Sequence, residues 1–225
     1  MAKRLAIQRL PALPIEGHRS SGAGGPDHPM RVATRRAAGL DAGGWTRQLR
    51  SEVAGYFDDL ADEWHTRSSW QRTAVVMDAF IRGLDAVHFS GGVALEVGSG
   101  IGTYSHLLAE RFAKVVAVDL SLAMLKLAPA RPAHRVQADG ARLPIADSSA
   151  AAIVLINAFL FPVEVDRVLS PHGALVWVNS SGEQTPIYLS VDDLVAGLPG
   201  RWTGTSSQAG EGHWCVLRRA LYPAR

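Results

Sequence analysis

A carboxylate followed by three regularly spaced glycines is the stretch of this chain best suited to hold a ligand. Glu96 lies two residues before Gly98, and Gly100 and Gly102 follow at alternate positions, with Ser99 inside the run. A short apolar run precedes the glycines and a helical pattern follows them, which predicts a buried strand, a tight turn and a helix N-terminus. Glycine allows positive φ and a close approach of a ligand to the backbone, and a helix start offers free N–H groups.

The spacing of these residues distinguishes between two kinds of ligand. A dinucleotide-binding turn reads G-x-G-x-x-G, whereas this stretch reads E-x-G-x-G-x-G. A carboxylate at this point would repel a pyrophosphate but suits a ligand that carries an ammonium group. Residues 93–104 resemble motif I of the class I S-adenosylmethionine-dependent methyltransferases. The resemblance implies S-adenosylmethionine as cofactor, bound in part by Glu96, Gly98, Ser99, Gly100 and Gly102.

Buried strands and helical segments alternate through the rest of the chain. Apolar runs recur about every twenty residues, at 93–97, 115–118, 135–138, 152–156 and 174–178. Helical crossovers between them predict a parallel sheet. Residues 202–206 and 213–218, separated by glycines, predict a terminal antiparallel hairpin. The expected fold is therefore α/β: a Rossmann-like three-layer α/β/α sandwich with a mostly parallel, seven-stranded sheet and a C-terminal antiparallel hairpin.

Acidic or amide residues follow several of these strands, at the sheet edge where open α/β folds bind ligands. The resemblance implies that Asp119 holds the ribose hydroxyls, with Leu120 beside the adenine. It also places Asp139, followed by Gly140, near the adenine amino group, and Asn157 where methyl donor and acceptor meet. A solvated strand end is the alternative for each Asp, and a turn-forming role is the alternative for Asn157.

Residues before motif I predict helices that cover the cofactor. An apolar face recurs at helical spacing between residues 53 and 64, and Arg67 follows as a candidate for a ligand carboxylate. The only catalytic candidates are His65 and His213, chosen because histidine titrates near neutral pH, and each has a structural or solvated alternative. The eight histidines show no metal-binding spacing, so we expect no metal site.

The first 44 residues contain four prolines, many glycines and no sustained periodicity. We therefore expect residues 1–44 to be a disordered basic tail and residues 45–225 to form the methyltransferase domain with its N-terminal lid helices. An arginine-rich transit peptide and a translation start at Met30 are alternatives for this segment.

Charge and composition exclude several classes of protein. Residues 1–50 contain nine basic and three acidic residues, a net charge of +6. Because the whole chain has a net charge of +2, the rest of the chain carries −4. This charge argues against nucleic acid as partner. No apolar run approaches the ~18 residues of a membrane span, and the single cysteine, Cys215, excludes an internal disulfide framework. We expect a cytoplasmic protein that does not bind membranes.

The predicted activity is methyl transfer to a small-molecule acceptor, by in-line displacement at the sulfonium methyl. Nearly all of the domain is used for the sheet and its crossovers, which leaves no room for an inserted target-recognition domain. Apolar candidates for the acceptor pocket are Phe159, Leu160, Phe161 and Tyr188, with core packing as their alternative. A non-catalytic S-adenosylmethionine-binding or regulatory protein is an alternative function, and a nucleotide-linked oxidoreductase is another.

Overall fold

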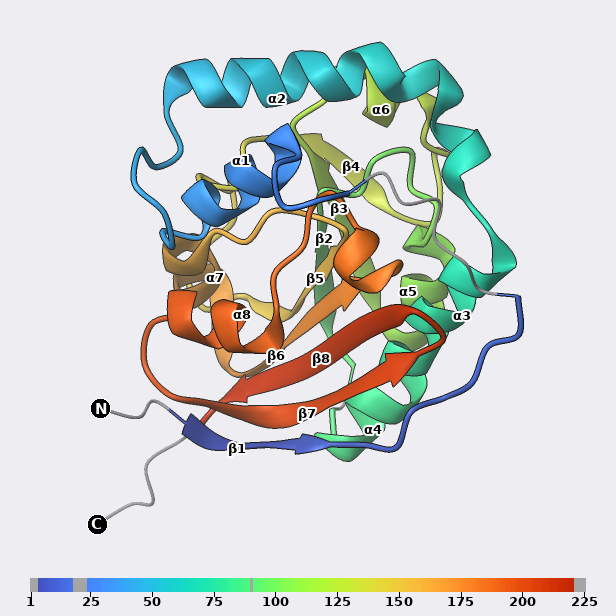
Figure 1. Ribbon diagram of the computed structural model, residues 1–225, viewed down its shortest axis with the longest axis vertical. Helices are drawn as coiled ribbons and strands as arrows, with labels where there is room; N and C mark the ends of the chain where they lie inside the picture. The colour runs from blue at the N-terminus through green and yellow to red at the C-terminus, as the bar shows by residue number, and fades with distance from the viewer. Residues whose placement is uncertain (1–3, 18–23, 90, 221–225) are drawn as a thin grey trace.

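The computed structural model describes residues 4–17, 24–89 and 91–220. An eight-stranded sheet has the order β1-β7-β8-β6-β5-β2-β3-β4 and is covered by helices on both faces (Figure 1). The strands are β1 (Arg4–Arg9), β2 (Val93–Val97), β3 (Lys114–Asp119), β4 (His134–Gln137), β5 (Ala150–Ile156), β6 (Leu169–Asn179), β7 (Trp202–Ala209) and β8 (Gly212–Arg219).

Eight α-helices are found in the described residues, joined by short segments of other helix types. They are α1 (Pro29–Ala37), α2 (Arg47–Leu60), α3 (Trp70–Asp78), α4 (Leu84–Ala86), α5 (Ser105–Arg111), α6 (Leu122–Leu127), α7 (Pro162–Val168) and α8 (Val191–Gly197). A 3₁₀ helix, η1 (Ala61–Arg67), continues α2, a π-helical turn, η2 (Ala79–Gly83), joins α3 to α4, and a 3₁₀ turn, η3 (Gly182–Gln184), follows β6. Within the residues that the structure describes, no helix is long and apolar enough to cross a membrane.

The predicted fold class is confirmed, and all seven predicted strands are present. Strands β2 to β6 pair in parallel, and β8 runs antiparallel to both β6 and β7. The sheet has eight strands rather than seven because β1 adds to its edge in parallel with β7.

The prediction of a disordered tail does not hold for residues 4–17 and 24–44. Strand β1 pairs with β7, and beyond it the N–H of Leu13 donates to the carbonyl of Gln208 at 2.8 Å. Helix α1 buries Met30 and Ala33. These segments lack a strong pattern of their own because their stability comes from backbone pairing and from contacts with distant parts of the chain. Residues 1–3 and 18–23 lie outside the described residues.

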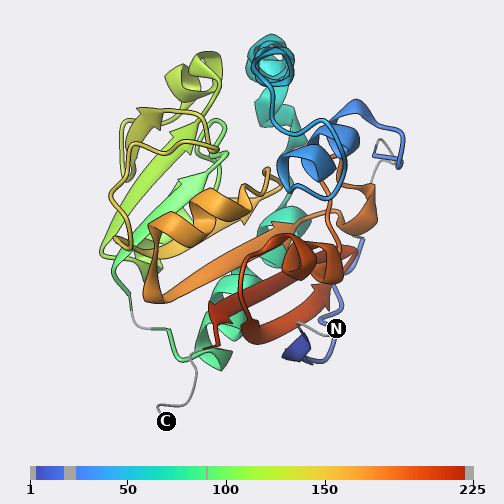
Figure 2. The same ribbon diagram turned by 90° about the vertical axis from the view of Figure 1, so that its left-hand side faces the viewer.

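The core lies on both faces of the sheet because neighbouring residues of a strand point to opposite sides. Along β5, Val154 packs with α3 and α5, whereas Leu155 packs with α7 and α8. Figure 2 shows the two helical layers from the side. The candidate site lies at the carboxyl ends of β2, β3 and β5.

Helix α2 lies across these carboxyl ends, along the top of Figure 1. Thr46 caps its start by accepting a hydrogen bond from the N–H of Leu49 at 3.1 Å. Near its end, Asp58 accepts hydrogen bonds from Ser121 Oγ at 2.5 Å and from the N–H of Ala123 at 3.3 Å. These bonds attach α2 to the start of α6, so the helix forms a cover over the sheet edge.

Candidate functional site

The glycine turn between β2 and α5 has the backbone that its sequence predicts. Gly98, Gly100 and Gly102 have φ values of 74°, 54° and 71°. A Cβ at Gly98 would lie 2.6 Å from that of Ala158, and a Cβ at Gly100 would lie 3.4 Å from Trp64 Nε1. All three positions therefore favour glycine for their conformation, and Gly98 also for its close approach to Ala158.

Asp119 lies at the end of β3, and its carboxylate faces this turn. Its Oδ2 accepts a hydrogen bond from the N–H of Gly100 at 2.7 Å, and its Oδ1 accepts one from the N–H of Ser121 at 2.8 Å. Burial raises the pKa of Asp119, although these backbone hydrogen bonds act in the opposite direction. Leu120, the next residue, is half-buried and lines the same cavity.

Glu96 lies under the glycine turn and is almost fully buried, with 2% of its surface exposed. Its carboxylate accepts a hydrogen bond from Ser105 Oγ at 2.5 Å, which ties β2 to the start of α5. Burial raises the pKa of Glu96 to about 7, more than the hydrogen bond from Ser105 lowers it. A buried carboxylate of this kind gains from a cationic ligand, because a positive neighbour favours its charged form.

Ser99 places an unpaired polar group at the turn. Its Oγ is buried and lines the cavity, and it is the one buried side-chain oxygen or nitrogen in the described residues without a hydrogen-bond partner. Leaving such a group unpaired costs about 1–3 kcal/mol. A ligand with a polar group at this point, such as the amino-acid part of S-adenosylmethionine, fits the turn.

Asp139 is engaged by the segment that leads into the lid. Its carboxylate accepts hydrogen bonds from Trp45 Nε1 at 3.0 Å and from the N–H of Ala141 at 2.9 Å, and Arg50 lies at 3.5 Å. The Trp45 ring packs edge-on against Phe161, with centroids 5.0 Å apart. Trp45 thus lies against the carboxylate that is predicted to contact the adenine. The sequence alone did not indicate the contact between Trp45 and Asp139.

Asn157 and Gly140 lie at the neighbouring strand ends. Asn157 has a φ of 50°, its Nδ2 donates to Ser180 Oγ at 2.9 Å, and its Oδ1 accepts from the N–H of Ser180 at 2.8 Å. A Cβ at Gly140 would lie 2.7 Å from the ring of Phe161. Asn157 therefore has a turn conformation and also lines the cavity.

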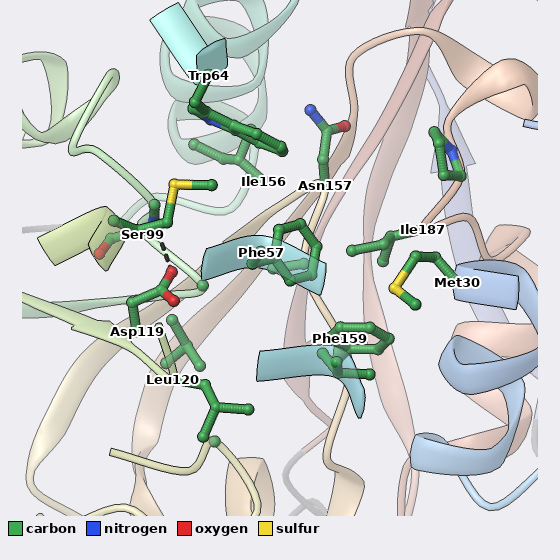
Figure 3. Close-up of a pocket in the computed structure, with 18 of the residues that line it drawn as sticks. Met30, Phe57, Trp64, Ser99, Asp119, Leu120, Ile156, Asn157, Phe159 and Ile187 are labelled. Atoms are coloured by element: carbon green, nitrogen blue, oxygen red, sulfur yellow. Dashed lines mark hydrogen bonds between the residues drawn. The ribbon is translucent and has the colours of Figure 1, made fainter. Parts of the chain in front are cut away.

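One cavity brings these residues together. Its empty volume is about 1630 Å³, including the solvent at its mouth, and all the predicted cofactor residues except Gly102 line it. Figure 3 shows Ser99, Asp119 and Leu120 on one side, Phe57 and Asn157 in the middle, and Met30, Phe159 and Ile187 on the other side. Lining residues that the sequence did not assign include Met30, Trp45, Ser180 and Ile187.

The two histidine candidates lie elsewhere. His65 is exposed on η1, with its Nδ1 3.0 Å from the carbonyl oxygen of Asp62. His213 lies beside Tyr188, with ring centroids 6.3 Å apart, and burial lowers its pKa. Neither lines the cavity, and within the described ranges no other histidine does. The described residues also contain no group of three or more histidine, cysteine or acidic side chains able to hold a metal.

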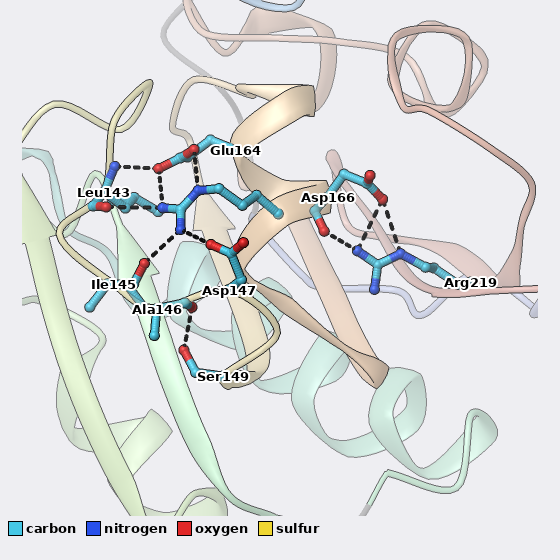
Figure 4. Close-up of polar contacts among 9 residues, drawn as sticks. Leu143, Ile145, Ala146, Asp147, Ser149, Glu164, Asp166 and Arg219 are labelled. Atoms are coloured by element: carbon cyan, nitrogen blue, oxygen red, sulfur yellow. Dashed lines mark hydrogen bonds and ion pairs between the residues drawn. The ribbon is translucent and has the colours of Figure 1, made fainter.

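Arg167 joins α7 to the loop of residues 143–147, and Figure 4 shows its partners Leu143, Asp147 and Glu164. Its guanidinium donates to Glu164 at 2.6 Å, to the carbonyl of Leu143 at 3.0 Å and to Asp147 at 2.6 Å. Glu164 in turn accepts a hydrogen bond from the N–H of Leu143 at 2.5 Å. This network fixes the loop that follows Asp139.

Comparisons with known proteins agree with this geometry. A family model described as "Methyltransferase domain" matches residues 95–177. A demethylmenaquinone methyltransferase of Thermobifida fusca (strain YX) is 31% identical over 129 residues, 53% of this chain and 54% of that protein. A second one, from Paenarthrobacter aurescens (strain TC1), is 30% identical over 177 residues, 69% of this chain and 66% of that protein. The chain thus spans about half to two thirds of the length of these curated relatives.

A solved structure shares the fold. The DhpI–SAH complex superposes with a TM-score of 0.62 at 17% identity, covering 79% of this chain and 100% of that one. The matched residues 95–177 include the glycine turn, Asp119, Asp139 and Asn157. The chain therefore belongs to the class I S-adenosylmethionine-dependent methyltransferases, a family of enzymes whose methyl donor is S-adenosylmethionine.

Proposed function

We propose that this chain transfers a methyl group from S-adenosylmethionine to a small-molecule acceptor. The observation that carries the proposal is the cavity at the sheet edge, which has the glycine turn and Asp119 on one side and an apolar wall on the other. A cofactor and an acceptor held in this cavity would meet near Asn157, between the two sides.

The cofactor side supplies the groups that S-adenosylmethionine needs. We assign Asp119 to the ribose hydroxyls and Glu96 to the neighbourhood of the ammonium group, with Ser99 as a hydrogen-bond donor or acceptor. Arg67 and Arg72 also line the cavity, and a guanidinium pairs well with a carboxylate. Asp139 would receive the adenine amino group alongside Trp45.

The acceptor side favours an apolar small molecule. Phe57, Phe159 and Ile187 line it, and an apolar pocket with few polar groups is typical of small-molecule sites. The two curated relatives are named for demethylmenaquinone, which makes this compound the first acceptor to test.

We propose that catalysis rests on the positioning of acceptor and methyl donor and on the exclusion of water. When bound, S-adenosylmethionine supplies an already activated methyl group on its sulfonium sulfur. The residues of this chain then align the acceptor for in-line displacement, while α2 covers the cavity. We assign no general base, since neither histidine candidate reaches the cavity.

Calorimetry with S-adenosylmethionine, S-adenosylhomocysteine and NADH tests the cofactor. We expect the two sulfur compounds to bind and NADH not to bind; the reverse result would favour an oxidoreductase. An acceptor screen with methyl-labelled S-adenosylmethionine follows, with demethylmenaquinone, tRNA and DNA as acceptors. Label in demethylmenaquinone or another small molecule supports the proposal, whereas label only in nucleic acid refutes it. Cofactor binding without any turnover would favour a regulatory protein.

A further inference from the structure

The middle of the cavity and the side away from Ser99 and Asp119 form an apolar compartment, which consists of Met30, Val53, Phe57, Phe159 and Ile187. Met30, Val53 and Ile187 are buried and form one hydrophobic cluster, and the two phenylalanines are half-buried against it. All five side chains line the cavity. Figure 3 shows Met30, Phe159 and Ile187 on the side opposite Ser99 and Asp119.

Two segments far apart in the sequence build the outer wall of this compartment. Met30 comes from α1, and Ile187 comes from the segment after η3. Arg31, the residue after Met30, joins the two. Its Nη2 donates to the carbonyl oxygens of Glu183 at 2.6 Å and Thr185 at 2.8 Å, and its Nε donates to that of Pro186 at 3.4 Å.

Further contacts hold Arg31 in this position. Its Nη2 also donates to the carbonyl of Gly24 at 2.9 Å, and its guanidinium lies over the ring of Tyr188, 4.9 Å from the centroid. The planar guanidinium offers five N–H donors in a rigid fork, so it can bind several carbonyls of one loop together. Arg31 thereby fixes Ile187 against Met30.

We infer that the apolar compartment binds an apolar ring of the acceptor, and that Arg31 is a positioning residue that holds its wall in place. The inference rests on the proposed methyltransferase function and specifies its acceptor. Aromatic rings pack favourably against Phe57 and Phe159, and the thioether of Met30 makes favourable contacts with ring edges. The amide of Asn157 and the hydroxyl of Ser180 lie along the path to the cofactor side, where they would orient a ring hydroxyl or carbonyl.

Loss of Arg31 should therefore affect the acceptor and leave the cofactor nearly unchanged. The cofactor residues lie in the glycine turn and at the carboxyl ends of β2, β3, β4 and β5, and Arg31 makes none of the hydrogen bonds described above with them. A residue that served only overall stability would change both affinities together.

The test uses 1-naphthol as a planar aromatic probe, measured by its fluorescence, and S-adenosylhomocysteine, measured by calorimetry. We expect Arg31→Ala to weaken naphthol binding tenfold or more while the affinity for S-adenosylhomocysteine stays within twofold. The naphthol affinity of Arg31→Lys should be close to that of Arg31→Ala, because an ammonium lacks the planar fork of a guanidinium. Arg35→Ala is the matched control one turn along α1, since Arg35 pairs with Asp41 and Asp193 at the surface, and it should change neither affinity.

Met30→Ala keeps the test decisive should Arg31→Ala fail to fold. This variant leaves Arg31 in place but removes apolar wall, and we expect it to weaken naphthol binding about tenfold. Wild-type protein that binds S-adenosylhomocysteine but not naphthol overturns the inference and leaves the proposed function standing. Unchanged naphthol binding in Met30→Ala, or equal loss of both ligands in Arg31→Ala, also overturns it. Wild-type protein that fails to bind S-adenosylhomocysteine contradicts the proposed function itself.

Discussion

The carboxylate of Asp119 is hydrogen-bonded to the glycine turn, with its Oδ2 2.7 Å from the backbone nitrogen of Gly100. The bond links the end of β3 to the ligand-binding turn, so the turn and the carboxylate form one rigid unit. Because Asp119 also accepts from the N–H of Ser121, its orientation is set before any ligand arrives. Such preorganisation lowers the entropic cost of binding.

Replacement of Asp119 should weaken cofactor binding. We expect Asp119→Ala to lose at least tenfold in affinity for S-adenosylhomocysteine, since hydrogen bonds to a charged group are worth about 1.5–3 kcal/mol. Its melting temperature should also fall by a few degrees, because Gly100 and Ser121 lose an acceptor. Calorimetry measures the affinity, and Asp85→Ala, at an exposed ion pair with Arg111, is the control. Unchanged affinity would refute the assignment of Asp119 to the ribose.

Stability should depend on pH through Glu96. With a pKa raised to about 7 by burial, Glu96 keeps its proton in the folded state at pH values where the unfolded chain has lost it. Its contribution to the free energy of unfolding therefore falls as pH rises from about 4.5 to 7. Glu96→Gln should remove this part of the pH dependence, as measured by melting temperature against pH. Identical slopes for the two proteins would contradict the prediction.

Cofactor binding should release a proton from the same group. The ammonium of S-adenosylmethionine favours the charged carboxylate, so binding lowers the pKa of Glu96 from about 7. Affinity should therefore rise as pH increases from 6 to 8. At pH 6.5 the enthalpy of binding should vary with the ionisation enthalpy of the buffer. A Glu96→Gln variant whose binding enthalpy varies just as much would assign the proton to another group.

Removal of Arg167 should destabilise the loop behind Asp139. Arg167→Ala removes the guanidinium from the buried carboxylate of Glu164 and from the carbonyl of Leu143, so Glu164 keeps the N–H of Leu143 but loses its ion pair. We expect the free energy of unfolding to fall by about 2 kcal/mol or more. The control is Arg111→Ala, whose ion pair with Asp85 is exposed and should be worth at most about 1 kcal/mol. Urea unfolding of both variants measures the difference; equal losses would show that the network adds nothing.

Truncation before Asp41 should show what β1 and α1 together contribute. A chain that starts at Asp41 lacks β1 and α1, so the edge of β7 loses its backbone partner and the apolar compartment loses Met30. We expect a lower melting temperature and weaker naphthol binding, whereas the residues around Asp119 remain. Thermal unfolding and the two ligand titrations check this. A truncated chain that melts like the full one would show that β1 and α1 only lie against the domain.

The elements that the sequence predicted well are those whose information is local. The glycine turn and the strand that ends at Asp119 each follow from a few neighbouring residues. Trp45 and Arg31 were missed because their partners, Asp139 and the 183–186 carbonyls, lie about 90 and 150 residues away. Strand β1 was missed for the same reason, since only the edge of β7 makes it a strand.

The pairing of β1 with β7 has a consequence for folding during synthesis. Thr205 Oγ1 donates to the carbonyl of Gln8 at 3.1 Å, across 197 residues of chain. At a synthesis rate of ~5–20 residues per second, β1 emerges about 10–40 seconds before its partner strand. Until then its backbone groups pair only with water or with another chain. The first strand therefore cannot join the sheet until most of the chain has been made, and β7 of a second copy can compete for it before then.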